Sequence, residues 1–480
     1  AARQLCSPTG TCWIWVEGRV SEFIDKITGI VGATGVLTGA DVAARPASWL
    51  RPEPCQAKAI IRPANTEELA DVMRVCHAAG QSVIPVGGNT GLVEGATASE
   101  NDVLLSLERM TSIEELDETG CTMTVEAGVP LHTVQERAAD AGLVFPVDFG
   151  ARGSAQIGGA ISTNAGGNAV IRYGMMREQV LGLEAVLADG TVVSSMNRLL
   201  KNNAGYDVKQ LFIGTEGTLG VITRAVLRLR PAPRSRNTAL VAIDDYGNVP
   251  QLLNSLGGAL GGTLSAFEVL WKDFYDTVVV EHNRHQAPVA AGFPWYVLIE
   301  SRGGDQESDD ARFQSALEQA LEAGLIVDAA LASSAKQREA MWAIRDDIDG
   351  LAEILDPVMA FDVSLPIANT AEYAARVNER LCERWPDTFR CTTFGHLGDN
   401  NLHFLLTIGS KAHDEQSEVM RIIYEELRPY RGSISAEHGI GLEKRPYLDV
   451  SRDSAEVSLM RTLKQALDPQ GILNPGRVFR

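Results

Sequence analysis

The chain has 480 residues, of which 45% are hydrophobic, enough to bury the cores of about three domain-sized units. Asp and Glu number 62 against 43 Lys and Arg, so the formal net charge is −19 at pH 7. This negative charge argues against binding to nucleic acid or to anionic membrane surfaces. An anionic ligand would therefore need local positive charge from a metal ion, an arginine or oriented backbone amides.

Seven cysteines are scattered along the chain without a CxxC pair, which predicts neither a disulfide framework nor a zinc site built from thiolates. No uninterrupted apolar run is long enough to span a membrane, and no secretory signal is recognisable. We therefore expect a soluble protein of the cytoplasm or, in a eukaryote, of the mitochondrial matrix. Residues 1–20 read unlike the rest, and a non-native leader is one interpretation of them.

The first part of the chain alternates short strands with helices. Alternation or apolar content predicts strands over residues 59–63, 82–86, 103–107, 112–116, 122–125 and 220–229, the last of them amphipathic. One helix is predicted to begin at Asn65 or Thr66, with acidic residues in its first turn, and another covers residues 129–141. The prolines of Pro231-Ala232-Pro233 then predict a domain boundary.

The rest of the chain is predicted as a second α+β unit followed by a short C-terminal segment. Its expected strands are 238–243, 295–300 and 359–363, its expected helices are 309–323 and 335–354, and a further helix precedes residue 467. We therefore divide the chain into an N-terminal segment 1–55, a first domain 56–233, a second domain 234–444 and a C-terminal segment 445–480.

Three glycine-rich loops lie in the first domain. They are Val86-Gly87-Gly88-Asn89-Thr90-Gly91, the stretch Gly153–Asn168 and the stretch Phe212–Ile222. Glycine allows backbone N–H groups to turn toward an anion, so three such loops indicate a site for an extended nucleotide. The first two loops lack the GxGxxG spacing and the acidic residue of a Rossmann motif, which disfavours NAD.

These loops resemble the FAD-binding domain of the vanillyl-alcohol oxidase superfamily, in the branch of D-lactate and D-2-hydroxyglutarate dehydrogenases. The resemblance extends from about Ile60 to the C-terminus and includes Arg172-Tyr173-Gly174 and Asn474-Pro475-Gly476. It implies an α+β protein with a two-subdomain FAD-binding domain, an α+β substrate (cap) domain and a C-terminal segment that returns to the flavin. It also implies that the first loop holds the pyrophosphate and that Asn474 lies near the isoalloxazine.

The resemblance implies FAD contacts in all three loops and at the C-terminus. The implied residues are Pro85, Gly87, Gly88, Asn89, Thr90, Gly91, Ser154, Gly158, Gly159, Thr163, Asn164, Gly166, Gly167, Arg172, Glu216, Gly217, Gly220, Val221, Ile222 and Asn474. Some relatives bind FAD covalently through His or Cys in or near these loops. Residues 87–91 contain neither, so we expect non-covalent FAD.

A second group of motifs indicates a metal site. His396 and His403 stand on either side of a Gly-Asp-Asn turn, and paired strands at its ends would bring both imidazoles to one metal ion. Glu437 supplies a carboxylate, and two His with one Glu leave an open coordination position, as catalytic zinc requires. The alternative is a set of buried, hydrogen-bonded histidines. The resemblance implies metal ligation by His396, His403 and Glu437, zinc or another divalent ion, and a general base at His438.

The expected reaction is oxidation of a D-2-hydroxy acid to the 2-keto acid by hydride transfer to flavin N5. Arg345 matches the arginine that binds the substrate carboxylate in this branch, and the alternative is a surface pair with Asp349. Relatives that act on 2-hydroxyglutarate carry Thr, Lys and Asn where this chain has Asp349, Ala360 and Leu405. These changes remove groups that would hold a second carboxylate, and Asp349 would repel one, so we expect a monocarboxylic substrate such as D-lactate or a larger apolar analogue.

Other functions and partners stay open at this point. D-2-hydroxyglutarate is the alternative substrate, while a flavin-free zinc hydrolase and a non-redox binding protein with this fold are alternatives of other classes. The electron acceptor is unidentified, with an electron-transfer flavoprotein or a quinone as candidates. The oligomeric state is open as well, with a homodimer among the options.

Overall fold

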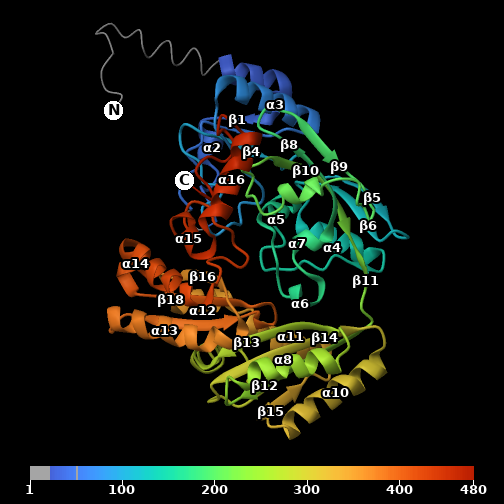
Figure 1. Ribbon diagram of the computed structural model, residues 1–480, viewed down its shortest axis with the longest axis vertical. Coiled ribbons are helices and arrows are strands. Elements are labelled where there is room, and N and C mark those ends of the chain that lie inside the picture. The colour runs from blue at the N-terminus through green and yellow to red at the C-terminus, as the bar shows by residue number, and fades with distance from the viewer. Residues whose placement is uncertain (1–21, 50–51, 480) are drawn as a thin grey trace.

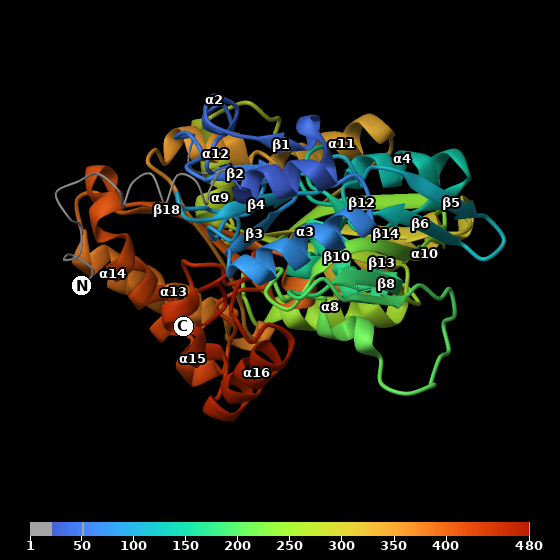
Figure 2. The same cartoon turned by 90° about the horizontal axis from the view of Figure 1, so that it is seen from above.

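The computed structural model describes residues 22–49 and 52–479, so the interpretation of residues 1–20 falls outside it (Figure 1). Two sheets and their helices form one half of the molecule, at the top of Figure 1, and a large sheet forms the other half below. In Figure 2 the loop after strand β9, drawn in green, projects from the first half. Within the described part, no helix is both long and apolar enough to cross a membrane.

The first sheet is small and mainly parallel. Its strands, in spatial order, are β1 (Val36–Leu37), β2 (Ala59–Ile61), β4 (Val103–Ser106) and β3 (Val83–Val86). Helix α3 (Thr66–Ala79) forms the connection that parallel strands require. The side chain of Asn65 accepts the backbone N–H of Glu68 at 2.8 Å, which confirms the predicted start of this helix.

The second sheet is antiparallel. Its strands, in spatial order, are β5 (Ile113–Asp117), β6 (Thr122–Glu126), β10 (Val221–Arg228), β8 (Val180–Val186) and β9 (Val192–Ser195). The prediction of an amphipathic strand at β10 is wrong, because this central strand is buried on both faces apart from Arg224 and Arg228. Arg224 is accommodated because it pairs with Glu114 and Glu184.

Short helices and a small strand pair complete this half. The helices are α2 (Ala40–Ala43), α4 (Leu131–Asp140), α5 (Ile157–Thr163), α6 (Val170–Tyr173) and α7 (Met176–Gln179). Strand β7 (Leu143–Val144) pairs with β11 (Arg230–Pro231), and the chain then passes to the large sheet.

The third sheet has seven antiparallel strands. In spatial order they are β15 (Asp328–Leu331), β12 (Ser235–Ile243), β14 (Trp295–Gly303), β13 (Leu264–Trp271), β17 (Arg390–Gly395), β18 (Asn401–Thr407) and β16 (Met359–Ser364). Strand β13 is absent from the prediction because Glu268 interrupts its apolar run. Strands β17 and β18 are the paired strands that the spacing of His396 and His403 requires.

Helices cover both faces of this sheet. The helices on one face are α8 (Asn248–Ala259), α10 (Gln306–Glu322), α13 (Thr370–Arg384) and α14 (Ala412–Glu425). Part of the opposite face packs on α9 (Lys272–Tyr275), α11 (Ala335–Arg345) and α12 (Ile348–Ile354). The prediction of one helix over 335–354 is wrong, because the Asp347 side chain accepts the N–H of Gly350 and starts a new helix.

The C-terminal segment returns to the first half. The predicted helix that precedes residue 467 consists of α15 (Leu448–Ser451) and α16 (Ser454–Leu467), separated because Asp453 forms a capping box with Glu456. Helix α16, red in Figure 1, packs on the core of the first half through Leu463 and Leu467. The backbone N–H of Asn474 then donates to the carbonyl of Val83 at 2.8 Å, which brings residue 474 to the start of β3.

Candidate functional site

The three glycine loops meet at the end of strand β3. A methyl group on Gly88 would overlap the backbone carbonyl oxygen of Ser154, so only glycine allows the first loop to approach the second this closely. The third loop joins them, since the backbone N–H of Glu216 donates to the carbonyl of Ser162 at 2.8 Å. The side-chain amide of Asn474 donates to the carbonyl of Glu216 at 2.6 Å. Residues far apart in sequence therefore form one cradle.

Two polar atoms in this cradle are buried and lack partners among the described residues. They are Oδ1 of Asn474 and Oε1 of Gln156. Buried polar atoms are rarely left without a hydrogen bond, so such atoms indicate a missing donor. A large polar ligand with donor groups, such as a flavin nucleotide, fits this arrangement.

Not every predicted cofactor residue turns its side chain into the cradle. Arg172 instead donates to the backbone carbonyls of Arg302 and Thr263 in the second half. The carboxylate of Glu216 is likewise turned away and accepts the N–H groups of Ile440 at 2.6 Å and Gly441 at 2.8 Å. Both side chains therefore tie the two halves together in this structure, and a role of the two residues in cofactor binding stays a prediction.

The remaining predicted cofactor residues lie in or beside the loops. Thr163 donates to the carbonyl of Gly159 at 3.1 Å, and the side chain of Asn164 accepts the N–H of Arg177 at 2.9 Å. The backbone N–H of Gly167 donates to Oε1 of Glu437 at 2.7 Å. The second loop therefore also reaches the candidate metal ligands.

The three predicted metal ligands come together from separate elements. His396 follows β17, His403 lies on β18, and Glu437 lies in the loop of residues 433–441. One donor atom from each residue lies within 4.8 Å of the others. Two imidazoles and one carboxylate at this spacing match the donor set of a catalytic zinc site.

His396 is held by charged groups that are themselves buried. Its Nδ1 lies 2.8 Å from the carboxylate of Glu268, which also accepts from Nε of Arg345 at 2.9 Å. Burial opposes the charge on Glu268, but His396 and Arg345 outweigh it and lower its pKa to about 2. Burial likewise opposes protonation of His396, but Glu268 outweighs it and raises its pKa. Nη2 of Arg345 lies 3.0 Å from Nε2 of His396.

His403 is the neutral member of the group. Burial, reinforced by the neighbouring His396 and Arg345, lowers its pKa well below the ordinary value, which keeps a lone pair available for a metal ion. Its ring stacks on Phe394, with 5.1 Å between ring centroids. The guanidinium of Arg345 lies 5.2 Å from the centroid of the same phenyl ring.

The predicted base, His438, pairs with an aspartate. Nδ1 of His438 lies 3.1 Å from Oδ1 of Asp362, which is fully buried on β16 and also contacts Nζ of Lys444. Burial alone would raise the pKa of Asp362, but His438, Lys444 and backbone hydrogen bonds hold it well below the ordinary value. Asp362 is therefore a carboxylate beneath the histidine.

The predicted substrate residues lie in different parts of the structure. Arg345 is buried, so the alternative of a surface pair with Asp349 is wrong. Asp349 is exposed on α12, beyond the break after α11, so it does not follow Arg345 on one continuous helix. Leu405 and Ala360 are direct partners on β18 and β16, two residues from His403 and Asp362. All four side chains therefore share one face of the sheet.

Three charged residues of the site are missing from the predicted set: Glu268, Asp362 and Lys444. Glu268 and Asp362 each stand alone in an apolar strand, in Phe267-Glu268-Val269 and Phe361-Asp362-Val363. A charged side chain in a buried strand requires a partner, which is the signal that would have found both carboxylates. Lys444 carries no comparable signal, since it lies in a polar loop.

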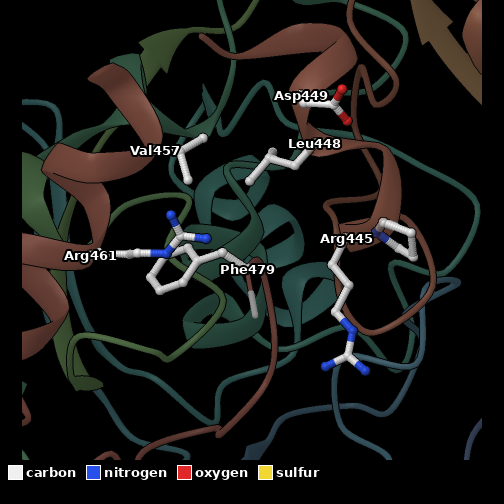
Figure 3. A pocket seen from close by; sticks show the side chains of 7 residues that line it. Arg445, Leu448, Asp449, Val457, Arg461 and Phe479 are labelled. Carbon is white, nitrogen blue, oxygen red and sulfur yellow. The ribbon is translucent and has the colours of Figure 1, made fainter. Parts of the chain in front are cut away.

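A surface pocket of about 260 Å³ lies elsewhere, against helices α15 and α16. Figure 3 shows the guanidinium of Arg461 beside the ring of Phe479, with Arg445 on the opposite side. The cation lies 5.9 Å from the ring centroid. None of its lining residues belongs to the loops or to the His/Glu group, so it is not the candidate active site.

Comparison with family models agrees with this division of the site between two halves. Residues 57–195 match a model described as an FAD binding domain. Residues 232–478 match a model described as the C-terminal domain of FAD linked oxidases. The first match contains the first two glycine loops, and the second contains His396, His403, Glu437 and His438.

Named relatives match over most of the chain. The mitochondrial D-2-hydroxyglutarate dehydrogenase of Bos taurus is 38% identical over 90% of this chain and 78% of its own length. The D-2-hydroxyglutarate dehydrogenase of Xanthomonas citri pv. viticola is also 38% identical, over 90% of this chain and 91% of its own.

Solved structures share the fold at lower identity. A p-cresol methylhydroxylase with bound substrate superposes with a TM-score of 0.76 at 15% identity, covering 96% of this chain and 97% of that one. An alkyldihydroxyacetonephosphate synthase gives 0.73 at 16% identity, covering 95% and 85%. These matches confirm the predicted α+β fold of the vanillyl-alcohol oxidase type.

Replacing Gly88 by Ala should weaken FAD binding, because the new methyl group would push the first loop away from Ser154. Overpacking of this kind costs about 1–3 kcal/mol, which corresponds to a loss of about 5- to 150-fold in affinity. Flavin absorbance per protein after desalting, together with titration of the apoprotein, measures the effect. Gly150→Ala is the matched control, since a methyl group there meets no atom within 4 Å. Equal FAD affinity in both variants would contradict the prediction.

Proposed function

The chain belongs to the family of FAD-dependent D-2-hydroxy-acid dehydrogenases, and from this premise we propose that it uses a divalent metal ion, zinc by its donor set, to oxidise a monocarboxylic D-2-hydroxy acid. The observation that carries the proposal is the convergence of His396, His403 and Glu437, with Glu437 bonded to the second glycine loop. This bond ties the candidate metal site to the FAD-binding loops.

The three donor residues suit a metal ion, provided that one neighbouring side chain, that of Arg345, moves away. Glu268 engages Nδ1 of His396, which leaves Nε2 as the ligand atom and resembles the carboxylate–histidine pairs of zinc sites. Nη2 of Arg345 lies 3.0 Å from that Nε2 and would have to turn away. The released guanidinium would then be free to bind the substrate carboxylate, as a planar bidentate donor does.

His438 is proposed to remove the hydroxyl proton of the substrate. Its Nδ1 engages Asp362, so the other ring nitrogen is the one able to accept a proton. When bound, FAD would supply the hydride acceptor, non-covalently held, and the metal ion would supply charge that stabilises the developing alkoxide. The positions of His438 and Glu437 next to each other in the chain support a shared substrate.

The proposed substrate is D-lactate or a larger apolar analogue. Leu405 and Ala360 are uncharged partners on the sheet face that carries His403, so this face offers no cation for a second carboxylate at these two positions. Asp349 no longer contributes to this argument, because it is exposed on another helix. D-2-hydroxyglutarate is the second candidate, favoured by the names of the bovine and Xanthomonas relatives.

The proposals about cellular location and partners are less specific than those about the site. The bovine relative is named as mitochondrial, which supports the mitochondrial alternative for a eukaryotic source. The predictions of a flavoprotein or quinone as electron acceptor, and of a homodimer, stay predictions. A flavin-free hydrolase and a non-redox binding protein do not agree with membership of this enzyme family.

Replacing His403 by Asn should remove zinc from the purified protein, because one of three protein ligands is lost. We expect the zinc affinity to fall about 100-fold or more, since even residues that only orient a ligand contribute about 10–100-fold. Metal analysis after dialysis against buffered zinc measures it. His285→Asn is the control, because His285 pairs with Asp347 outside the group. Zinc retained at wild-type affinity in His403→Asn would refute the proposed ligand set.

Replacing His438 by Asn should slow flavin reduction by about 10²–10⁴-fold, the usual contribution of a general base. Anaerobic stopped-flow bleaching of the flavin by the substrate measures the rate, with FAD and zinc contents determined on the same sample. His132→Asn, on α4 at the surface, is the control. A near-normal rate in His438→Asn would remove this residue from the mechanism.

The wild-type enzyme should show a higher kcat/KM on at least one monocarboxylic D-2-hydroxy acid than on D-2-hydroxyglutarate. Replacing Ala360 by Lys places a cation beside Leu405 and should shift this ratio about two- to fivefold toward D-2-hydroxyglutarate, as a partly exposed ion pair contributes about 0.5–1 kcal/mol. Leu331→Lys, on β15 at the opposite edge of the sheet, is the control. A wild-type preference for D-2-hydroxyglutarate over every monocarboxylic acid would overturn the assignment.

A further inference from the structure

The carboxylate of Asp362 organises the loop that carries Glu437 and His438. Its Oδ2 accepts three successive backbone N–H groups, from Ala436 at 2.9 Å, Glu437 at 2.8 Å and His438 at 3.0 Å. The hydroxyl of Ser435 lies 3.3 Å from the same oxygen. One oxygen of a fully buried side chain therefore holds this turn in place.

The other oxygen of Asp362 faces the side chains of Lys444 and His438. Oδ1 contacts Nζ of Lys444, which is only 3% exposed, and lies 3.1 Å from Nδ1 of His438. An ionised carboxylate only accepts hydrogen bonds, so the proton of a neutral His438 must reside on Nδ1. Nε2 then carries the lone pair, which is the state that a general base requires.

We propose that Asp362 is a positioning residue that selects the Nδ1–H tautomer of His438 and so directs the basic nitrogen away from the sheet. The inference rests on the proposed role of His438 as the base. Lys444 supplies a balancing charge, which adds to the hydrogen bonds from Ser435 and the three backbone N–H groups in stabilising the buried carboxylate. The competing explanation is that Asp362 only anchors the loop, in which case the tautomer would not depend on its charge.

The double variant Asp362→Asn with Lys444→Gln separates these explanations. The asparagine oxygen would stay on the three backbone N–H groups, because turning it would set donors against donors. Its amide NH₂ would then face Nδ1 of His438 and the side-chain oxygen of the glutamine introduced at position 444, so Nδ1 must accept and the proton moves to Nε2. Replacing both residues together also avoids leaving the buried ammonium of Lys444 without its carboxylate partner.

Lys444→Gln alone is the matched control. It keeps the Asp362 carboxylate as an acceptor and retains a side-chain donor at position 444. We expect this variant to keep the Nδ1–H tautomer. A change of tautomer in the double variant would then follow from the identity of residue 362 and not from the loss of the lysine.

The readout is nitrogen-15 NMR of histidine-labelled holoenzyme containing FAD and zinc, with His438 assigned by its absence in His438→Asn. Wild type and Lys444→Gln should show Nδ1–H, and the double variant should show Nε2–H. Flavin reduction in the double variant should slow about 100-fold, with little change in KM and with zinc and FAD retained. D-lactate and D-2-hydroxyglutarate are the two substrates tested.

Three outcomes overturn the inference: an Nε2–H tautomer in the wild-type enzyme, an unchanged tautomer in the double variant, or a wild-type rate of flavin reduction in that variant. The first needs only the His438→Asn variant for the assignment, so the inference can be refuted even if the double variant does not fold. Near-normal flavin reduction in His438→Asn would instead refute the proposed base. The NMR comparison would still report whether Asp362 sets the tautomer.

Discussion

The loop of residues 433–441 is held by carboxylates that receive its backbone N–H groups, and the whole site depends on this arrangement. Asp362, in the second half of the molecule, accepts three consecutive N–H groups of this loop. Glu216, in the first half, accepts two more N–H groups of the same loop. Glu437, on the loop itself, accepts the N–H of Gly167 in return. Because these bonds join side-chain oxygens to backbone donors of separate segments, the loop is fixed relative to both halves.

This arrangement explains how an acidic protein can serve an anionic substrate. The net charge is −19, yet the carboxylates nearest the candidate site are already engaged by backbone amides, Arg345 or Lys444. Their charge is therefore compensated at short range, where the interior screens little. The positive charge that an anionic substrate needs would then come from the proposed metal ion and from Arg345 after its release from His396.

The sequence predicts most elements whose signals are local. Asn65 caps α3 as expected, and the glycine loops and His/Glu motifs come together as their residue types suggest. Helix breaks are harder to predict, because apolar residues continue at helical spacing from Ile344 to Ile348 although the Asp347 side chain caps the start of a new helix. Partners across the fold were hardest, since no spacing rule links Glu216 to Ile440 or Asp362 to Lys444. Those pairings follow only from how the halves pack.

The contact between Arg345 and His396 has a consequence for the protein without the proposed metal ion. Glu268 is fully buried, and an unpaired charge there would destabilise the fold by several kcal/mol. The guanidinium of Arg345 and the imidazole of His396 supply its partners within the polypeptide itself, so burial of Glu268 needs no metal ion. Binding of the proposed metal ion would then exchange one cation for another at His396: Arg345 would leave the imidazole and become free to bind the carboxylate of the substrate.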